Sequence, residues 1–287
     1  MSADLERVRG VEGIELALHR WSHGGVALLF LHGYDNDSHV WDAFTPDLAP
    51  HYQTLALDHR GHGRSAWDPR ARYDPETLAH DVEAVLAHLG LERVVLVGHS
   101  LGGRVALHFA RRAAQRLAGL VLVDVGPELD LRGVQRIRMD RETVEPSFAS
   151  LDEFEGVLSV RYPATNRDTL ARLARHWLRR RDDGRYETRT DPAFGGTRAG
   201  RSESATRAWS EAQAKILWET LGRIPCPSLV VRGAASDILD PDVAERMAEE
   251  VLPDGRLAVI PRAGHSVMLD NPEAFREVLS GFVLGDG

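Results

Sequence analysis

Ser100 lies in the short glycine-rich segment Gly98-His99-Ser100-Leu101-Gly102, which follows an apolar run and precedes a helical pattern. The pattern G-x-S-x-G between a buried strand and a helix is typical of a sharp turn that exposes a serine hydroxyl. The glycines leave room where a side chain would clash, and the N–H of Leu101 would point at the reacting centre from the helix N-terminus. The segment therefore predicts that Ser100 is a nucleophile.

A serine hydroxyl is a poor nucleophile without a base, so the chain should supply a histidine and an orienting acid. His265 lies in "PRAGHSVMLDNP", after the last apolar run and before a helical pattern. That position predicts a loop at the same sheet edge as Ser100. His99 flanks the turn, but we expect it to point away from the side of the nucleophile. His265 is therefore the expected base.

Two carboxylates compete for the role of the acid, since each follows a strand that should end at this edge. Asp237 lies in "VVRGAASDIL", four residues past the run that ends at Gly233, and Asp124 ends the run in "VLVDVGP". We expect Asp237, because a loop carboxylate beyond the strand can reach the imidazole of His265. It would hold the imidazole tautomer and stabilise the imidazolium. Asp124 is the alternative acid.

An oxyanion hole is the third requirement of such a site. The segment "LFLHGYDND" places His32 and Gly33 at the end of an early apolar run, and Gly33 permits a sharp turn. The N–H groups of Tyr34 and Leu101 would then be two donors to developing negative charge, each often worth ~3 kcal/mol. His32 is expected to stabilise this loop rather than to transfer protons.

The sequence predicts alternating strands and helices that would position these residues. The sequence opens with an antiparallel pair that turns near Glu12 and Gly13. Dense Val and Leu runs then predict buried strands at 27–33, 54–59, 93–99, 119–125, 228–233 and 256–261. Amphipathic patterns predict helices at 77–90, 102–114, 243–251 and 272–282. This alternation predicts an α/β fold with a mostly parallel sheet and helices on both faces.

One region interrupts the alternation after the sixth strand. Residues 128–210 contain no buried-strand run, but they contain helix-like segments such as "DTLARLARHWLRR" and arginine-rich linkers. We therefore expect a core domain formed by 1–127 and 211–287, with 128–210 inserted as a helical cap, or lid.

The predicted cap should decide which substrate is admitted. Trp177 belongs to a set of aromatic residues that could form an apolar wall, and Arg136 to a short arginine-rich segment. An arginine facing the pocket would select a carboxylate, because its fork binds carboxylates through two hydrogen bonds. A solvated cap surface is the alternative. His32, Gly33 and His99 are further candidates for substrate contact.

Composition narrows the class of partner. The chain has 287 residues and a formal net charge of −8, which argues against nucleic acid as a partner. Its one cysteine, Cys226, excludes an intramolecular disulfide and is expected to be buried. No apolar stretch is long enough for a membrane span, and the N-terminus lacks an apolar signal region. We expect a cytoplasmic protein with a small-molecule substrate, as a monomer or a homo-oligomer.

Five motifs occur in a fixed order: HG at 32–33, "DHRGHGRS" at 58–65, "GHSLGG" at 98–103, "RGAASD" at 232–237 and "AGHSVMLDNPEAF" at 263–275. Through these motifs and their order, the chain resembles the α/β-hydrolase fold superfamily over about 27–125 and 213–283. The resemblance implies that Ser100, Asp237 and His265 form the catalytic triad. It also implies that Tyr34 and Leu101 supply the oxyanion hole and that the insertion is the cap.

The residues narrow the reaction further. A serine at 100 argues against the haloalkane dehalogenases and epoxide hydrolases of this superfamily, which place an aspartate there. His99 disfavours the C–C bond hydrolases, which often have asparagine before the nucleophile. We expect a carboxylic ester or lactone hydrolase that forms an acyl-enzyme. A C–C hydrolase of a β-diketone or ring-cleavage product, a cofactor-free perhydrolase, an acyltransferase and a ligand receptor without turnover are the alternatives. We expect no organic cofactor and no metal ion.

Overall fold

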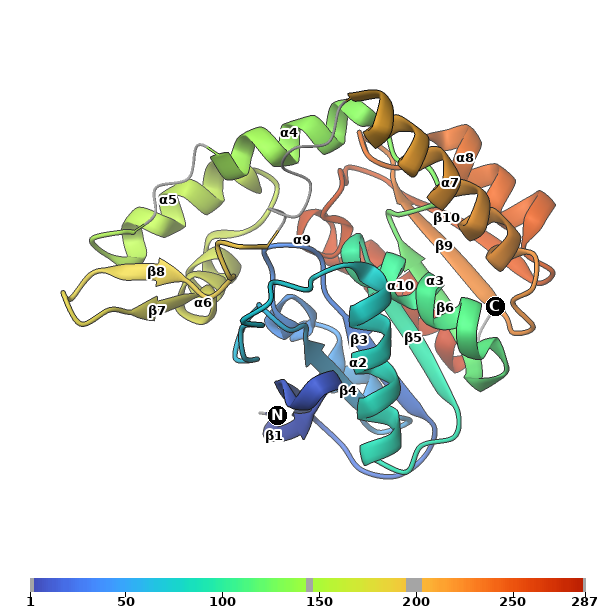
Figure 1. Cartoon of the computed structure of the whole chain (residues 1–287), viewed down its shortest axis with the longest axis horizontal. Helices are drawn as coiled ribbons and strands as arrows, with labels where there is room; N and C mark the ends of the chain where they lie inside the picture. The colour runs from blue at the N-terminus through green and yellow to red at the C-terminus, as the bar shows by residue number, and fades with distance from the viewer. Residues whose placement is uncertain (1–2, 143–146, 195–202, 286–287) are drawn as a thin grey trace.

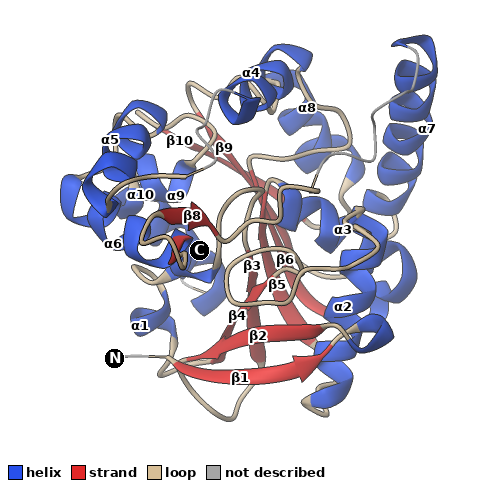
Figure 2. Ribbon diagram, turned by 60° about the vertical axis from the view of Figure 1, so that its left-hand side comes forward, coloured by secondary structure: helices blue, strands red, loops and turns tan. Residues whose placement is uncertain are grey.

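The computed structural model describes residues 3–142, 147–194 and 203–285. Its centre is an eight-stranded sheet in the order β1-β2-β4-β3-β5-β6-β9-β10. Helices cover both faces of this sheet, and a group of helices with a small hairpin extends to one side of it (Figure 1, Figure 2). The predicted fold class, an α/β-hydrolase fold with a mostly parallel sheet, is confirmed.

The N-terminal strands form the antiparallel edge that the sequence predicts. β1 (Asp4–Arg9) pairs with β2 (Glu15–Arg20), and the chain reverses through Glu12 and Gly13, which have φ angles of 55° and 77°. β2 is also antiparallel to β4, and every later pairing in the large sheet is parallel. The remaining strands are β3 (Ala27–Leu31), β4 (Gln53–Asp58), β5 (Val94–His99), β6 (Leu117–Val123), β9 (Ser228–Gly233) and β10 (Gly255–Ile260).

Burial on both faces explains why the central strands are continuously apolar. Along β5, Val94 and Leu96 belong to one hydrophobic cluster and Val95 and Val97 to another, because successive side chains point to opposite faces. The edge strand β10 is less buried, and Val259 on it is 51% exposed. The strand predicted at 256–261 is therefore present, but it is not buried like the other strands predicted from apolar runs.

Helices on the first face belong to the cluster that contains Leu96. They are α2 (Pro75–His88), α3 (Leu101–Ala113), the C-terminal part of α7 (Glu203–Leu221) and α8 (Pro241–Glu245), which continues as a π-helix over Arg246–Val251. The other face is covered by the 3₁₀-helix η2 (Ser38–Trp41), α1 (Thr45–Leu48), α9 (Val267–Asp270) and α10 (Pro272–Leu284). Short 3₁₀ turns lie at Val11–Gly13 and Ala114–Arg116. The four helices predicted from periodicity are all present.

The segment between β6 and β9, called the inserted segment below, begins with helices and then departs from the prediction. It contains α4 (Leu131–Glu142), α5 (Leu151–Arg161) and α6 (Arg167–Trp177), followed by the antiparallel hairpin β7 (Leu178–Arg180) and β8 (Tyr186–Thr188). The hairpin was not expected. α7 crosses the expected boundary at 210–211, because Leu217 and Leu221 near its end are buried in the core cluster.

The sequence predicts a buried cysteine and no segment that spans a membrane. Cys226 is a free thiol that is 4% exposed and packs in the first core cluster, as expected for a small apolar side chain. Within the described ranges, no helix combines the length and apolarity needed to cross a bilayer.

Candidate active site

Ser100 occupies a strained turn between β5 and α3. Its φ of 50° and ψ of −113° are unusual for a residue with a side chain, and its N–H donates to the carbonyl of Val123 at 3.1 Å. A Cβ added at Gly102 would lie 2.1 Å from the carbonyl oxygen of Leu31, so only glycine fits there. The turn thus holds the hydroxyl of Ser100 above the carboxyl end of the sheet.

Three side chains form a continuous hydrogen-bonded chain at this edge. Nε2 of His265 lies 3.0 Å from Oγ of Ser100, and Nδ1 of His265 lies 2.8 Å from Oδ2 of Asp124. Asp124 is fully buried, while the side chain of His265 is 11% exposed. When Nδ1 donates to the carboxylate, Nε2 is left as an acceptor for the serine proton. The geometry therefore fits a nucleophile, a base and an orienting acid.

The expectation that Asp237 is this acid is wrong. Both carboxylate oxygens of Asp237 accept hydrogen bonds from Arg136, at 2.6 and 2.8 Å, and its side chain is 38% exposed. This ion pair lowers the pKa of Asp237, although partial burial opposes the shift. The sheet order supplies the physical reason. β6 lies beside β5, which carries Ser100, whereas β9 lies one strand farther away.

Asp124 is held in place by the end of β9. Its own N–H donates to the carbonyl of Val231 at 2.7 Å, and its Oδ1 accepts from the N–H of Gly233 at 3.0 Å. Its φ of 50° turns the carboxylate away from the strand path and toward His265. These bonds fix the carboxylate before any substrate arrives.

Ser236 is a supporting residue that the sequence analysis missed. Its Oγ accepts from the N–H groups of Ile238 and Leu239 at 3.1 and 3.2 Å and donates to Oδ2 of Asp124. A serine whose hydroxyl accepts from the N–H groups two and three residues later is a recognised local turn, and Ser236 directly precedes Asp237 in the motif. That turn pattern is the feature of the sequence from which a supporting role for Ser236 could have been predicted.

His99 supports His265 rather than facing the substrate. Its ring lies 4.7 Å from the ring of His265, and its Nε2 donates to the carbonyl of His265 at 2.9 Å. Burial, followed by the proximity of His265, lowers the pKa of His99 well below its usual value. The expectation that His99 points away from the site is therefore wrong, because its ring packs directly under the base. Asp270 also holds the loop that carries His265, since it accepts from the N–H of Gly264 at 2.8 Å.

His32 and Gly33 build the loop that follows β3. Nδ1 of His32 donates to the carbonyl of Gly33 at 2.7 Å, and its Nε2 accepts from the N–H of His59 at 3.0 Å. His32 is fully buried, so it stabilises the loop, as expected, and cannot contact a substrate. A Cβ at Gly33 would lie 2.6 Å from Nδ1 of His99, which explains the glycine.

The two expected oxyanion donors lie on neighbouring segments. Leu101 is the first residue of α3, whose start packs against the end of β3 where the His32–Gly33–Tyr34 loop begins. After Tyr34 the chain turns through Asp35, whose φ is 60°. The ring of Tyr34 lies 5.1 Å from that of Phe194 in the inserted segment. The two expected donor residues therefore lie just beyond the carboxyl ends of the neighbouring strands β3 and β5.

The inserted segment contacts this same loop at the three consecutive residues after Tyr34. Each of these residues forms a hydrogen bond with a side chain from the end of α5, from the residue that follows α5, or from α6. The pairs are Asp35 with Arg161 (2.8 Å), Asn36 with the hydroxyl of Tyr162 (3.3 Å) and Asp37 with the indole N–H of Trp177 (3.0 Å). Trp177 is 4% exposed, so the structure places this candidate in the seam between the inserted segment and the loop.

A grouping of potential metal ligands lies in the same seam. Ligand atoms of His39, Asp42 and His176 lie within 4.8 Å of one another. Asp42 already accepts from Arg172 at 2.5 Å and lies 3.0 Å from Nδ1 of His39. The rings of His39 and His176 stack at 3.5 Å, so their in-plane lone pairs run side by side rather than converging on one point. This arrangement fits an ion-paired contact better than a metal centre.

Comparison with known proteins bears on the family of the chain and on its class of reaction. A family model described as "alpha/beta hydrolase fold" matches residues 26–272. Esterase Rv0045c of Mycobacterium tuberculosis is 29% identical over 287 residues, covering 98% of this chain and 90% of that protein. The 2-(acetamidomethylene)succinate hydrolase of Mesorhizobium japonicum is 26% identical over 259 residues, covering 90% of this chain and 88% of that protein.

Among solved structures, E-2-(acetamidomethylene)succinate hydrolase superposes with a TM-score of 0.83 at 23% identity. The match covers 98% of this chain and 99% of that one. At this identity the likeness establishes the common fold. The superposition includes the inserted segment as well as the sheet, since it covers nearly the whole chain.

Proposed function

Because the chain belongs to the α/β-hydrolase fold family and is a hydrolase, we propose that it is a serine hydrolase acting on a carboxylic ester or lactone. The observation that carries the proposal is the chain of hydrogen bonds from Ser100 through His265 to Asp124. A small to medium-sized substrate would be cleaved through an acyl-enzyme.

In the proposed first half-reaction, Nε2 of His265 takes the proton of Ser100 as Oγ attacks the carbonyl carbon. The negative charge that develops on the carbonyl oxygen accepts hydrogen bonds from the N–H groups of Tyr34 and Leu101. The buried carboxylate of Asp124 stabilises the imidazolium. The tetrahedral intermediate then collapses, and the leaving alkoxide takes the proton from Nε2 of His265.

In the second half-reaction, His265 removes a proton from water, which attacks the acyl carbon. A second tetrahedral intermediate forms in the same oxyanion hole and expels Oγ of Ser100, which recovers its proton from His265. The acid product leaves and the resting state returns. These steps use side chains and backbone groups of the chain together with water.

The inserted segment would serve as the cap over this site, with residues 1–127 and 211–287 as the core and α7 shared across the boundary. The hydrogen bonds from Arg161, Tyr162 and Trp177 to the loop after Tyr34 support this assignment. Arg136 does not support selection of a carboxylate substrate, because its fork is occupied by Asp237.

The nucleophile is tested by labelling with a fluorophosphonate and by turnover of short-chain p-nitrophenyl esters. We expect the wild-type protein to be labelled and active, and Ser100→Ala to lose both properties. Ser159→Ala is the matched control, since it removes an exposed hydroxyl of α5 that bonds only within its own helix. Labelling or turnover that survives in Ser100→Ala would overturn the proposal.

The bond type is tested by a parallel screen of esters, lactones and β-diketones, with Ser100→Ala as the background. Ester or lactone turnover is expected to exceed β-diketone cleavage. Cleavage of β-diketones alone would instead assign C–C bond hydrolysis to the same serine.

A further inference from the structure

A cleft outside the catalytic edge is lined mainly by arginines. It has a volume of about 570 Å³ and is lined by residues of β1, of the loop after β4, of β7 and of the segment just after β8. Its principal lining residues are Arg7, Arg64, Ser65, Trp67, Arg179 and Arg189. The volume lies within the range of small-molecule sites.

The charge of this cleft is opposite to that of the whole protein. The chain carries a net charge of −8, yet four arginines and no acidic side chain line the cleft among the described residues. The charges of two of the arginines are partly neutralised by carboxylates that do not line the cleft. Arg7 lies 3.3 Å from Glu15, and Arg179 lies 2.8 Å from Glu187. The remaining pair, Arg64 and Arg189, makes no ion pair with a carboxylate in the described part of the chain, although the buried Asp37 and Asp58 lie close enough to favour the charged form of Arg189.

The guanidinium of Arg64 is exposed and has no hydrogen-bond or ion-pair partner among the described residues. Nε of Arg189 donates only to the carbonyl of Leu178, at 3.1 Å, which leaves its other donors without a carboxylate in the described part of the chain. Half-burial and, next, the charge of Arg64 lower the pKa of Arg189. These like charges repel, and a bound anion would relieve the repulsion.

The walls of the cleft are fixed independently of any ligand. The indole N–H of Trp67 donates to the carbonyl of Arg189 at 2.9 Å, and the guanidinium carbon of Arg179 lies 4.3 Å above the ring of Trp67. NH1 of Arg7 donates to the carbonyl of Arg64 at 2.6 Å. These contacts join the hairpin to the core loop, so the arginines are held around the cavity rather than dispersed on a flexible surface.

We propose that this cleft binds a phosphorylated small molecule. A tetrahedral phosphoryl group can accept hydrogen bonds from several guanidinium forks at once, whereas a carboxylate presents one plane that suits one fork. More than one negative charge is required to balance Arg64 and Arg189. The cavity is also larger than a single phosphate group, which leaves room for a second charged group or an organic portion. None of the residues proposed for ester hydrolysis lines this cleft.

Inorganic tripolyphosphate is the probe, and isothermal titration of the full chain at low ionic strength measures its binding. We expect saturable binding to one site. Arg64→Gln should weaken it about tenfold, the effect of one lost charge-assisted hydrogen bond. The double variant Arg64→Gln with Arg189→Gln should abolish binding. Circular dichroism and thermal unfolding check that each variant is folded.

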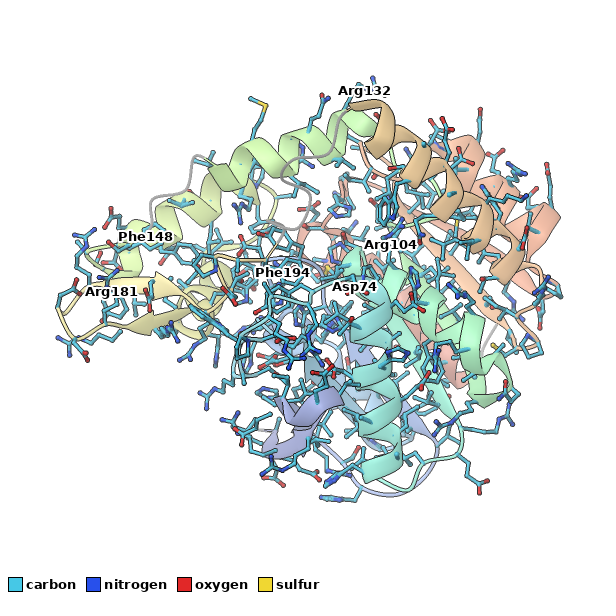
Figure 3. All side chains as sticks on the ribbon, in the orientation of Figure 1. Asp74, Arg104, Arg132, Phe148, Arg181 and Phe194 are labelled. Carbon is cyan, nitrogen blue, oxygen red and sulfur yellow. The ribbon has the colours of Figure 1, made fainter. Side chains whose placement is uncertain are left out.

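Arg180→Gln is the matched control, because Arg180 is exposed on the same hairpin beside Arg179 but does not line the cleft. Arg181, which Figure 3 labels at the outer part of the hairpin, is paired with Asp183 and is less suitable. Unchanged affinity in Arg180→Gln supports the site. An equal loss in that variant, absence of saturable binding by the wild type, or equally tight binding of citrate would overturn the proposal.

Discussion

Two neighbouring strand ends, after β6 and after β9, each present a carboxylate to the same edge of the sheet, yet the two carboxylates have different partners. Asp124 follows β6 by one residue, is fully buried and binds His265. Asp237 follows β9 by four residues, is partly exposed and binds Arg136 of the inserted segment.

This difference shows that a carboxylate at the end of the strand beside β5 reaches His265, whereas a carboxylate on a longer loop one strand farther away does not. Adjacent strands lie about 4.8 Å apart, so a carboxylate on the strand next to β5 needs little loop to reach the imidazole. The loop after β9 still contributes to the site through the N–H of Gly233 and the hydroxyl of Ser236. One strand end carries the carboxylate that we propose as the acid, and the other carries the donors that hold it.

The largest expected effect separates the two carboxylates directly. Asp124→Asn should lower kcat for ester hydrolysis by about 10³–10⁴-fold, because the imidazole loses the group that sets its tautomer and stabilises its charge. Asp237→Asn should change kcat by about twofold or less, as expected for a partly exposed ion pair. Steady-state kinetics on one p-nitrophenyl ester measures both. A large loss in Asp237→Asn with little loss in Asp124→Asn would reverse the assignment.

A smaller effect is expected where the loop after β9 supports the acid. Ser236→Ala should lower kcat about tenfold with KM nearly unchanged, because Asp124 loses a donor and two N–H groups lose their acceptor. Ser236→Thr keeps the hydroxyl and should restore most of the activity. If both variants lose activity equally, the hydroxyl is not the group that matters.

The same comparison extends to the two arginines by which the inserted segment holds core carboxylates. Arg161 binds Asp35 in the loop that carries Tyr34, whereas Arg136 binds Asp237 away from the reacting atoms. Arg161→Gln should lower kcat severalfold to about tenfold, since the oxyanion donor would be less well fixed. Arg136→Gln should leave kcat nearly unchanged. Similar kinetics in the two variants would show that the Asp35 contact has no positioning role.

The smallest expected effect concerns stability. The lowered pKa of Asp237 means that its ion pair stabilises the fold fully above the carboxyl's ordinary pKa, and that this stabilisation is lost as pH falls from there through the lowered native value. Arg136→Gln should therefore reduce the free energy of unfolding by about 0.5 kcal/mol at neutral pH and by less at pH 3. Urea unfolding at the two pH values measures this. A larger loss at low pH than at neutral pH would contradict the ion-pair account.

Local patterns were sufficient for much of the fold and for part of the site. Apolar runs predicted the six parallel-sheet strands, because strands covered by helices on both faces contain few polar residues. The turn around Ser100 was predictable, since Gly98 and Gly102 are spaced as this turn requires, where a Cβ at either position would clash with neighbouring backbone. The β7–β8 hairpin was missed because its three-residue strands carry charged side chains and no alternation long enough to recognise.

The sequence by itself determined that a strained serine, a loop histidine and two candidate carboxylates would meet at one sheet edge. Those features depend on residue type and spacing along the chain. Only the tertiary structure decided between Asp124 and Asp237, because the choice depends on which strand lies beside β5 and on Arg136 being positioned to capture Asp237. It alone also placed Ser236 under the acid and gathered Arg7, Arg64, Arg179 and Arg189 around one cleft. Strand order and contacts such as those of Ser236 with Asp124 and of Arg136 with Asp237 join residues more than a hundred positions apart, so no pattern within a short stretch of sequence predicts them.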